Sequence, residues 1–399
     1  MDSMDLARLR VLHLNSLLTG GGTDDQCVKL AAALHRLGQR VWLAGPAGSP
    51  FAPEIERAGL PFVNAGPGRI GFILRAARLI RGERVEIVHG HHGRDFWPVI
   101  WAARLAGTGP KIVLTRHLAK SPASWASRRL LLGRCDALVA VSEFVAKVLR
   151  EGVYEPDSPE AERRARPPMQ GDHSKIRVIY GGIDTERFQP APAPERRLAL
   201  GLEPGQFGFA VVGGYDFPRG KGQREFLKAA ARMHERIPRA RFLIIGRGAM
   251  TEVLRGDIAA LGLAGKARLT GQASDMPEVM NAIDCLVHPQ IGTEALGLVV
   301  CEAHACGKPV IASALDGIPE AFAIGARGEL VPPEDIGALA GALERQAGAP
   351  APDIAQARAM HEKVQRAFSL QRQAGEVLEL YRSLRKADGP RLVVRGQPE

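Results

Sequence analysis

Two glutamates, Glu294 and Glu302, lie in the segment GTEALGLVVCEA at residues 292–303. Glu302 sits inside an otherwise apolar, helix-like run, and a carboxylate buried there without a partner would be costly. The two vicinal hydroxyls of a ribose are natural donors to it. Glu294 precedes the predicted helix by two residues, so eight positions separate the carboxylates, which is up to about 12 Å on helical rise. This span favours opposite ends of a long ligand over an acid–base pair. The alternative interpretation is a core helix with a solvent-facing Glu302.

A second candidate is the glycine-rich loop VVGGYDFPRGKG at residues 211–222, between a predicted strand and a predicted helix. Arg219 and Lys221 place two cations beside the free N–H groups of a helix start, as a diphosphate requires. The loop lacks the GxxxxGK[ST] pattern of a Walker A motif. A solvated basic loop would have the same sequence, so both interpretations stay open here.

A third candidate is the run GGGT at residues 20–23, after the first predicted strand and before a helix that Thr23 or Asp24 would cap. Glycines let a backbone approach a phosphate or sugar closely, and the helix start favours an anion. The run is not GxGxxG, and no acidic residue ends the second strand, so a nicotinamide dinucleotide is disfavoured. A simple turn is the alternative.

Histidines gather at two predicted strand ends, in VEIVHGHH at residues 85–92 and LTRH at residues 114–117. Three histidines within four residues could suggest a metal, but no carboxylate or thiolate follows at ligand spacing, so we predict no metal site. A hydrogen-bonding role in a binding cleft is favoured instead, and His117 is the best placed for it.

Short β-branched runs alternate with longer amphipathic stretches along most of the chain. This alternation predicts parallel strands joined by crossover helices, that is, an α/β doubly wound sheet. In the first half, the predicted strands are Arg10–Asn15, Arg40–Ala44, Pro61–Asn64, Ile87–His91, Lys111–Thr115, Ala137–Val141 and Ile176–Tyr180. After residue 205 they are Phe207–Val212, Arg241–Ile245, Ala267–Thr270, Cys285–His288 and Pro309–Ala312.

Two interruptions divide this pattern into two domains. We predict an N-terminal Rossmann-like domain at residues 1–187, with a Pro-rich, charged insertion at 153–175. A Pro-rich linker at 188–206 leads to a C-terminal Rossmann-like domain at 207–367. We predict a last helix at 368–388 that packs back toward the first domain. Two such domains imply a cleft, and ligands of open α/β sheets gather at the carboxyl ends of the strands.

Composition limits the class of protein. The 399 residues are 45 % hydrophobic and 24 % charged, as in a globular protein with a sizeable core. No uncharged apolar run reaches about 18 residues, and the acidic, interrupted N-terminus is a poor signal peptide. The five cysteines are scattered without a CxxC pair, which is typical of free thiols in a reducing cytoplasm.

The net charge of +10 is uneven, because residues 1–190 carry 27 lysines and arginines against 19 acids. A basic half could meet nucleic acid, an anionic membrane or an acidic small molecule. Aromatic residues make up only 5 % of the chain, and none form a stacking platform among basic residues. We therefore predict no nucleic-acid partner.

Taken in order, these motifs resemble the retaining glycosyltransferases of family 4, whose GT-B fold has two Rossmann-like domains facing across a cleft. The resemblance covers nearly the whole chain, and the most specific part is the E-x7-E segment with the residues after it. The segments that carry it are the glycine run after the first strand, VHGHH, LTRH, VIYGGID, RGKG, EALGLVVCE, ACGKPVIAS and DGIPE.

The resemblance implies transfer of a sugar from a nucleoside-diphosphate sugar, with retention of anomeric configuration. Glu302 would bind the ribose hydroxyls and Glu294 the hydroxyls of the donor sugar. Gly297 and Leu298 would also contact the donor. The family uses no bound metal or cofactor, and the chain has no DxD triplet.

The same resemblance assigns Arg219 and Lys221 to the diphosphate and His117 to the neighbourhood of the donor sugar. Together with Glu294 these form the implied catalytic set. Gly21 and Gly22 would lie near the phosphate or the acceptor. Cations held near the diphosphate assist most as its negative charge grows in the transition state.

The chain departs from the family at one informative position. The family usually has an arginine directly after the glycine that ends the first strand of the second domain, and here that position is Gly214. The loop is also one residue longer, so the functional cations are Arg219 and Lys221 together or only one of them.

The implied acceptor is a glycan or a lipid-linked molecule, in cell-envelope or lipopolysaccharide assembly. Residues 69–84, RIGFILRAARLIRGER, alternate apolar and arginine side chains, as in a helix lying on an anionic lipid surface. An ordinary packing helix with a solvated arginine side is the alternative. In the lipid interpretation the protein is cytoplasmic and peripheral on the inner face of the membrane.

Two other functions remain open from the sequence. A nucleotide-sugar 2-epimerase could use the same scaffold without an acceptor. A non-catalytic lipid- or nucleic-acid-binding module could retain the fold, although it would have no need for Glu294, Glu302 and Lys221 together.

Overall fold

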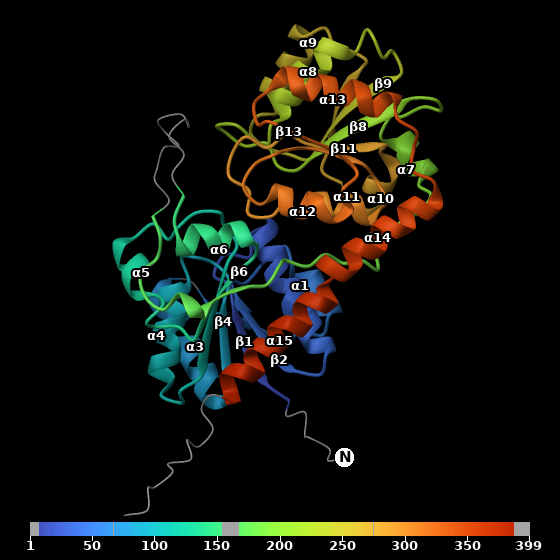
Figure 1. The fold of residues 1–399 in the computed structure, drawn as a ribbon. Helices are drawn as coiled ribbons and strands as arrows, with labels where there is room; N and C mark the ends of the chain where they lie inside the picture. Colours follow the sequence, from blue (N-terminus) through green and yellow to red (C-terminus); the bar gives the residue numbers. More distant parts are fainter. Residues whose placement is uncertain (1–7, 67, 154–166, 274, 387–399) are drawn as a thin grey trace, which may run out of the picture. The chain divides into compact units, whose positions relative to one another are not determined.

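The computed structural model describes residues 8–66, 68–153, 167–273 and 275–386. The chain separates into two compact units. Unit 1 comprises Met1–Val141, Val145–Tyr180 and Leu370–Glu399, and unit 2 comprises Ser142–Phe144 and Gly181–Ser369. Each unit is built around its own parallel β-sheet (Figure 1).

Unit 1 contains a seven-stranded sheet in the order β3-β2-β1-β4-β5-β6-β7, with every neighbouring pair parallel. Its central strands are buried on both faces, as expected for parallel strands covered by crossover helices. The strands are β1 Arg10–Leu14, β2 Arg40–Gly45, β3 Phe62–Asn64, β4 Ile87–Gly90, β5 Lys111–Arg116, β6 Ala137–Ala140 and β7 Ile176–Val178.

Helices cover both faces of this sheet. Helix α1 packs against the last helix α15 on one face, and α3 packs against α4 on the other (Figure 1). The helices are α1 Gly22–Arg36, α2 Ala52–Arg57, α3 Arg69–Gly82, α4 Phe96–Ala106, α5 Trp125–Leu130, α6 Glu143–Arg150, a 3₁₀ turn at His173–Lys175 and α15 Leu370–Lys386.

Unit 2 contains a six-stranded parallel sheet in the order β10-β9-β8-β11-β12-β13. Its core is dominated by apolar side chains of β8, β9 and β11 packed on α8 and α13. The strands are β8 Phe207–Val212, β9 Ala240–Ile245, β10 Ala267–Gly271, β11 Cys285–His288, β12 Val310–Ser313 and β13 Gly328–Val331.

The helices of unit 2 also form two layers, with α8, α9 and α13 on one face of the sheet and α10, α11, α12 and α14 on the other (Figure 1). The helices are α7 Pro194–Ala199, α8 Gln223–Met233, α9 Thr251–Ala260, α10 Met276–Ala282, α11 Leu298–Ala305, α12 Ile318–Gly325, α13 Ile336–Gly348 and α14 Ile354–Phe368. No helix among the described residues has the length and hydropathy that a membrane span needs.

The predicted doubly wound α/β architecture is confirmed in each unit, and the structure adds two elements that were not predicted. The Pro-rich stretch 188–206 contains helix α7, which starts at Pro194, and Arg196 of this helix is paired with Glu278 at 2.6 Å. Proline suits a first helical position because its missing N–H has no partner there anyway. The edge strand β13 was not among the predicted strands, because its sequence GELV is short and only Val331 is buried.

Of the predicted insertion at 153–175, residues 154–166 lie outside the described residues. The part that the structure describes belongs to unit 1, and Met169 in it is buried with its backbone N–H bonded to the carbonyl of Leu149. The predicted last helix corresponds to α15, which is described from Leu370 to Lys386.

Helix α15 is tied to the sheet of unit 1 through one buried polar contact. The Tyr381 hydroxyl and His89 Nδ1 are 2.6 Å apart, and His89 Nε2 lies 2.6 Å from the hydroxyl of Thr115. Tyr381 and His89 are both fully buried. The hydroxyl therefore satisfies a ring nitrogen that has no access to water.

Replacing Tyr381 with Phe should destabilise unit 1 by about 1–3 kcal/mol, because it leaves His89 Nδ1 buried without a partner. Urea unfolding followed by tryptophan fluorescence measures this, because all four tryptophans belong to unit 1. Glu379→Gln, on the exposed side of the same helix, is the control. Equal stability of Tyr381→Phe and the control would contradict the role of the hydroxyl.

Candidate functional site

In unit 2 the chain begins its sheet at β8, adds β9 and β10 on one side, and then returns to add β11, β12 and β13 on the other. The point between β8 and β11 is thus a topological switch point, where the loops that follow the two strands diverge. Lys221 comes from the loop after β8, and His288 and Glu294 come from the end of β11 and the segment after it. The switch point brings together Lys221 and Glu294, which were predicted, and His288, which was not.

Glu294 is the centre of this group, which we call the acid–cation cluster (Lys221, His288 and Glu294). The Nζ of Lys221 lies 3.3 Å from Glu294 Oε2, and Nε2 of His288 lies 3.8 Å from the same oxygen. The Glu294 side chain is 19 % exposed and that of His288 only 1 %. The pair predicted from separate motifs is therefore in direct contact.

The charges of the cluster depend on each other. Burial acts to raise the pKa of Glu294, but the charge of Lys221, the ring of His288 and two hydrogen bonds outweigh it, so that the pKa is lowered overall. Burial, with a smaller effect of Lys221, lowers the pKa of His288 to about 4. At neutral pH the cluster thus holds an ionised carboxylate and an uncharged imidazole.

Glycines shape the loop that carries Lys221. Gly213 has a φ of +137°, and a Cβ there would lie 2.9 Å from Cδ of Lys221, so the lysine stem crosses this residue closely. Gly222, with a φ of +82°, directly precedes α8, and a Cβ there would come within 1.8 Å of the Pro289 carbonyl oxygen. Only glycine lets the loop after β8 press this closely on the end of β11.

Arg219, the other predicted cation of the loop, faces a different acid. Its Nη1 lies 3.6 Å from a carboxylate oxygen of Glu334, which follows β13. The two predicted cations are therefore each placed opposite a carboxylate within unit 2.

Glu302 lies in helix α11, half-buried between the buried residues Cys301 and Ala303. The helix begins only at Leu298, because Gly297 before it is left-handed with φ 83°. The chain from Glu294 to Gly297 is not helical, so the expected separation of about 12 Å by helical rise does not apply. Gly297 and Leu298 form the amino-terminal end of α11, where backbone N–H groups have no helical partner.

In unit 1 the glycine run meets the start of helix α1. The helix begins at Gly22 with Gly21 as the capping residue and no side-chain cap, so the predicted cap at Thr23 or Asp24 is wrong. Asp24 is instead buried and accepts hydrogen bonds from the backbone N–H groups of Thr19 and Gly20, at 3.0 and 3.1 Å. It folds the loop back while the space around Gly21 and Gly22 stays open.

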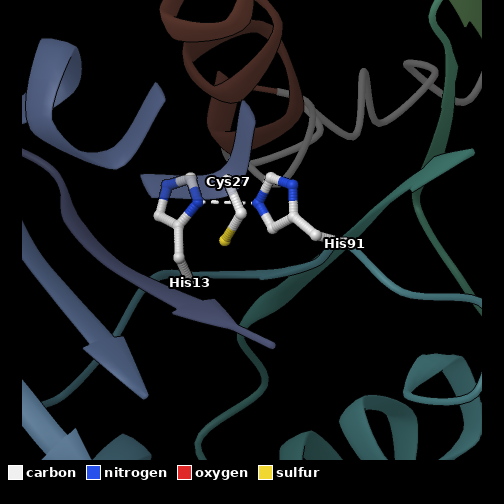
Figure 2. A group of neighbouring side chains, drawn as sticks. All are labelled: His13, Cys27 and His91. Atoms are coloured by element: carbon white, nitrogen blue, oxygen red, sulfur yellow. Dashed lines mark hydrogen bonds between the residues drawn. The ribbon is translucent and has the colours of Figure 1, made fainter. Parts of the chain in front are cut away.

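The histidines of unit 1 form a stacked group at the equivalent switch point, between β1 and β4. His13 of β1 and His91 after β4 are fully buried, and His13 Nδ1 lies 2.8 Å from His91 Nε2 (Figure 2). The ring of His91 stacks on that of His89 at 4.2 Å between centroids. His117, after β5, continues the row, with its Nε2 3.4 Å from His91 Nδ1.

These rings are uncharged at neutral pH. Burial lowers the pKa of His13 and of His117 to about 3. Burial and the neighbouring rings also lower the pKa values of His89 and His91 well below the ordinary value. Neutral imidazoles can both donate and accept, so the row can hold His117 in place as a hydrogen-bonding group.

Cys27 of α1 joins two of these histidines. One ligand atom each from His13, Cys27 and His91 lies within 4.8 Å of the others (Figure 2). Two nitrogens bound to one tetrahedral zinc would be about 3.3 Å apart, whereas the 2.8 Å between His13 and His91 is a hydrogen-bond distance. Burial and the nearby Asp24 raise the pKa of Cys27, which disfavours the thiolate that a metal needs. The prediction of no metal remains a prediction.

Sequence reasoning missed His288, which faces Glu294 in unit 2, and Tyr381, whose hydroxyl contacts His89 in unit 1. His288 is the last residue of a strand that was predicted correctly, and its position at a carboxyl end was the available signal. Tyr381 gave no such signal, since it reaches His89 from 292 positions away in the chain.

Comparison with known proteins connects these features to a family. The family model described as Glycosyltransferase Family 4 matches residues 20–187, and the model described as Glycosyl transferases group 1 matches residues 206–347. The chain belongs to the family 4 glycosyltransferases. The resemblance inferred from the motifs is thereby confirmed.

One relative is the D-inositol 3-phosphate glycosyltransferase of Mycobacterium marinum, 28 % identical over 333 residues. This match covers 78 % of the chain and 66 % of the relative. A glycosyltransferase structure from Rickettsia africae matches with a TM-score of 0.80 at 22 % identity, over 95 % of the chain and 99 % of its own. The structure of Anabaena Alr3699/HepE in complex with UDP matches with a TM-score of 0.75 at 18 % identity, over 94 % and 100 %. These matches confirm the GT-B fold class for this glycosyltransferase.

The neutral histidine row predicts a stability that falls in acid. The unfolded chain binds protons at its histidines as the pH drops below about 6.5, while the buried rings do so only near pH 3. Their contribution is therefore complete above pH 6.5 and is lost as the pH falls, by up to about 1.4 kcal/mol per ring and pH unit.

Urea midpoints of tryptophan fluorescence at pH 7.5, 6.0 and 5.0 test this, together with NMR titration of the histidine rings. The signals of His13 and His117 should remain those of neutral rings at pH 5. Rings that titrate near pH 6.5 would contradict the burial argument.

Proposed function

We propose that this family 4 glycosyltransferase transfers a sugar from a nucleoside-diphosphate sugar to a glycan or lipid-linked acceptor, with retention of configuration and without a bound metal or cofactor. The acid–cation cluster of unit 2 is the observation that carries the proposal. It combines a cation, an ionised carboxylate and the amino-terminal ends of α8 and α11 at one switch point. The UDP complex of the structurally similar Anabaena protein supports a nucleotide donor.

The proposed roles follow from the charges. Lys221 stabilises the diphosphate as negative charge grows on it during departure. Glu294 stays ionised beside Lys221 and accepts hydrogen bonds from hydroxyls of the donor sugar. Glu302, half-buried in α11, accepts hydrogen bonds from the ribose hydroxyls. His117, Arg219, Gly21 and Gly22 keep the roles that the family resemblance implies.

Glu302→Ala should weaken nucleoside diphosphate binding at least tenfold, because two hydrogen bonds to a charged acceptor are lost. Calorimetry with UDP, GDP and ADP identifies the base, and the 2′-deoxy form of the best ligand isolates the ribose contact. Removing the 2′-hydroxyl should weaken binding to the wild type but add little to the loss in Glu302→Ala.

The exposed Glu252→Ala is the matched control, with 79 % of its side chain accessible. If the 2′-hydroxyl matters equally in Glu302→Ala and in the control, Glu302 does not bind the ribose.

Lys221→Ala should lower turnover more than ground-state donor affinity, since the charge it stabilises develops during the reaction. Steady-state and single-turnover kinetics with the identified sugar nucleotide measure both. Incubating that donor without an acceptor separates transfer from 2-epimerisation, which would yield an epimerised sugar. Full turnover of Lys221→Ala would rule out its role.

For the acceptor, we propose that unit 1 docks on an anionic membrane surface from the cytoplasmic side. Helix α3 buries Phe72 and Ile80 in the unit, so these two apolar residues are not available to lipid. Ile70 and Leu74 stay 75 % and 44 % exposed, and Trp101 of the adjacent α4 is 51 % exposed. The exposed arginines of these two helices include Arg69, Arg75, Arg78, Arg81 and Arg104.

Vesicle sedimentation tests the membrane face. Wild-type protein should bind vesicles with 30 % phosphatidylglycerol and lose this binding with pure phosphatidylcholine or at high salt, since each cation contributes about 1 kcal/mol at an anionic surface. The double variant Ile70→Glu, Leu74→Glu should bind at least tenfold less. Leu198→Glu, 61 % exposed in unit 2, is the control. Equal binding by the two variants would contradict the proposal.

A further inference from the structure

A cavity of about 430 Å³ opens at the amino-terminal edge of the unit 1 sheet. Arg10 and Lys111, the first residues of β1 and β5, line it together with Glu86, which directly precedes β4. His91 and His117 of the histidine row follow the ends of β4 and β5, at the opposite edge of the same sheet. The cavity is therefore separate from the residues of the candidate site.

Positive charge dominates the lining of this cavity. Among the described residues that line it, Glu86 is the single acid, alongside four cations. The cations are Arg10, Arg84, Lys111 and Arg385, which come from β1, the loop before β4, β5 and α15. A cavity with this excess of positive charge attracts an anion.

Glu86 is shared between two of the arginines and cannot neutralise both. One carboxylate oxygen lies 3.2 Å from Nη1 of Arg385, and the other lies 3.6 Å from Nε of Arg10. Within the described part of the chain, the remaining guanidinium N–H groups of these two arginines make no hydrogen bond. Lys111 has a separate acid, Asp136, at 3.7 Å. The two arginines thus keep donors and a net positive charge for a ligand.

Arg84 lines the cavity without an acid opposite it. Its side chain is exposed and makes no ion pair or hydrogen bond with any other residue that the structure describes. Its backbone is left-handed, with a φ of +50°, a conformation that glycine adopts more readily than arginine. The chain therefore carries a guanidinium at a position where the backbone alone would favour glycine.

We propose that this cavity binds a phosphate group with at least two negative charges, as in a phosphate monoester or pyrophosphate. Arginines suit such a group because a guanidinium donates two parallel hydrogen bonds to phosphate oxygens. The volume of about 430 Å³ lies in the range of small-molecule sites, so a ligand larger than a bare phosphate ion fits. A soluble phosphorylated molecule and the headgroup of an anionic lipid share this chemistry.

A phosphate bound there joins parts of unit 1 that are distant in the chain. It bridges Arg385 of the last helix α15 to Arg84 beside β4 and to Arg10 at the start of β1. Because this ligand requires the folded unit, binding should raise the midpoint of thermal unfolding reported by the tryptophans of unit 1.

Calorimetry with inorganic pyrophosphate measures binding to the whole protein, with UDP, GDP and ADP present to occupy unit 2. The double variant Arg84→Ala, Arg385→Ala should bind at least tenfold more weakly, because two charge-assisted contacts are lost. The control Arg36→Ala, Arg57→Ala removes the same charge from exposed positions of α1 and α2 and should bind like the wild type. An equal loss in both variants overturns the inference.

Glu86→Gln should have the opposite effect. The amide oxygen of glutamine can still accept the backbone N–H of Arg10, which Glu86 accepts at 3.1 Å, while the negative charge beside the ligand disappears. Pyrophosphate should therefore bind about fourfold more tightly. Weaker binding by Glu86→Gln overturns the electrostatic argument, and thermal unfolding without ligand verifies that each variant is folded.

Lys221→Ala separates this site from the diphosphate site proposed in unit 2. Pyrophosphate should bind Lys221→Ala as it binds the wild type, and the nucleoside diphosphates should bind the Arg84, Arg385 double variant as they bind the wild type. If pyrophosphate binding is lost in Lys221→Ala but kept in the double variant, the ion occupies unit 2. The inference then falls while the proposed function is unaffected.

Vesicles identify the source of the phosphate. Sedimentation with vesicles that contain phosphatidic acid, a phosphate monoester, compares the Arg84, Arg385 double variant with the Arg36, Arg57 control. Weaker vesicle binding by the double variant assigns the phosphate to a lipid headgroup. Equal vesicle binding, with pyrophosphate binding lost in the double variant, assigns it to a soluble ligand. If the double variant binds both vesicles and pyrophosphate like the control, the cavity is not a phosphate site.

Discussion

The contact between Lys221 and Glu294 is the constraint on which the candidate site depends. Burial alone would raise the pKa of Glu294, and the charge of Lys221 opposes that effect, so that the pKa is lowered overall and the carboxylate stays ionised at neutral pH. Keeping the pair together requires the loop after β8 to lie on the end of β11, which Gly213 and Gly222 permit. The ion pair of the cluster thus depends on these two glycines, since a side chain at either position would push the loop after β8 away from the end of β11.

The strand order explains why polar residues gather at the topological switch point of the sheet in each unit. In unit 1 the first strand β1 lies between β2 and β4, and in unit 2 the first strand β8 lies between β9 and β11. At both points the following loops turn to opposite faces and leave room at the carboxyl edge. His13 pairs in register with His89 at one point, and His288 ends β11 at the other. Folding therefore gathers residues that are about 70 positions or more apart in the chain.

The sequence was sufficient for elements and motifs because both depend on local patterns. Buried parallel strands appear as short apolar runs, and all twelve predicted strands correspond to observed ones within a few residues at the ends. It was insufficient where a backbone conformation or one particular side-chain contact decides the outcome. The left-handed Gly297 delays the start of α11, Asp24 bonds the loop before it instead of capping α1, and His288 becomes significant only once Glu294 lies opposite it.

The two switch points differ in charge, although both contain buried histidines. In unit 1 burial removes the charge of the imidazoles, so the histidine row is held by neutral hydrogen bonds and stacking. In unit 2 burial also leaves the His288 ring neutral, but beside it Lys221 faces Glu294 at 3.3 Å and lowers the pKa of that carboxyl. A neutral row can position a hydroxyl-bearing ligand without attracting an anion, whereas a cluster with cations favours a phosphate. The fold supplies the location, and the side chains at each strand end decide which ligand chemistry it favours.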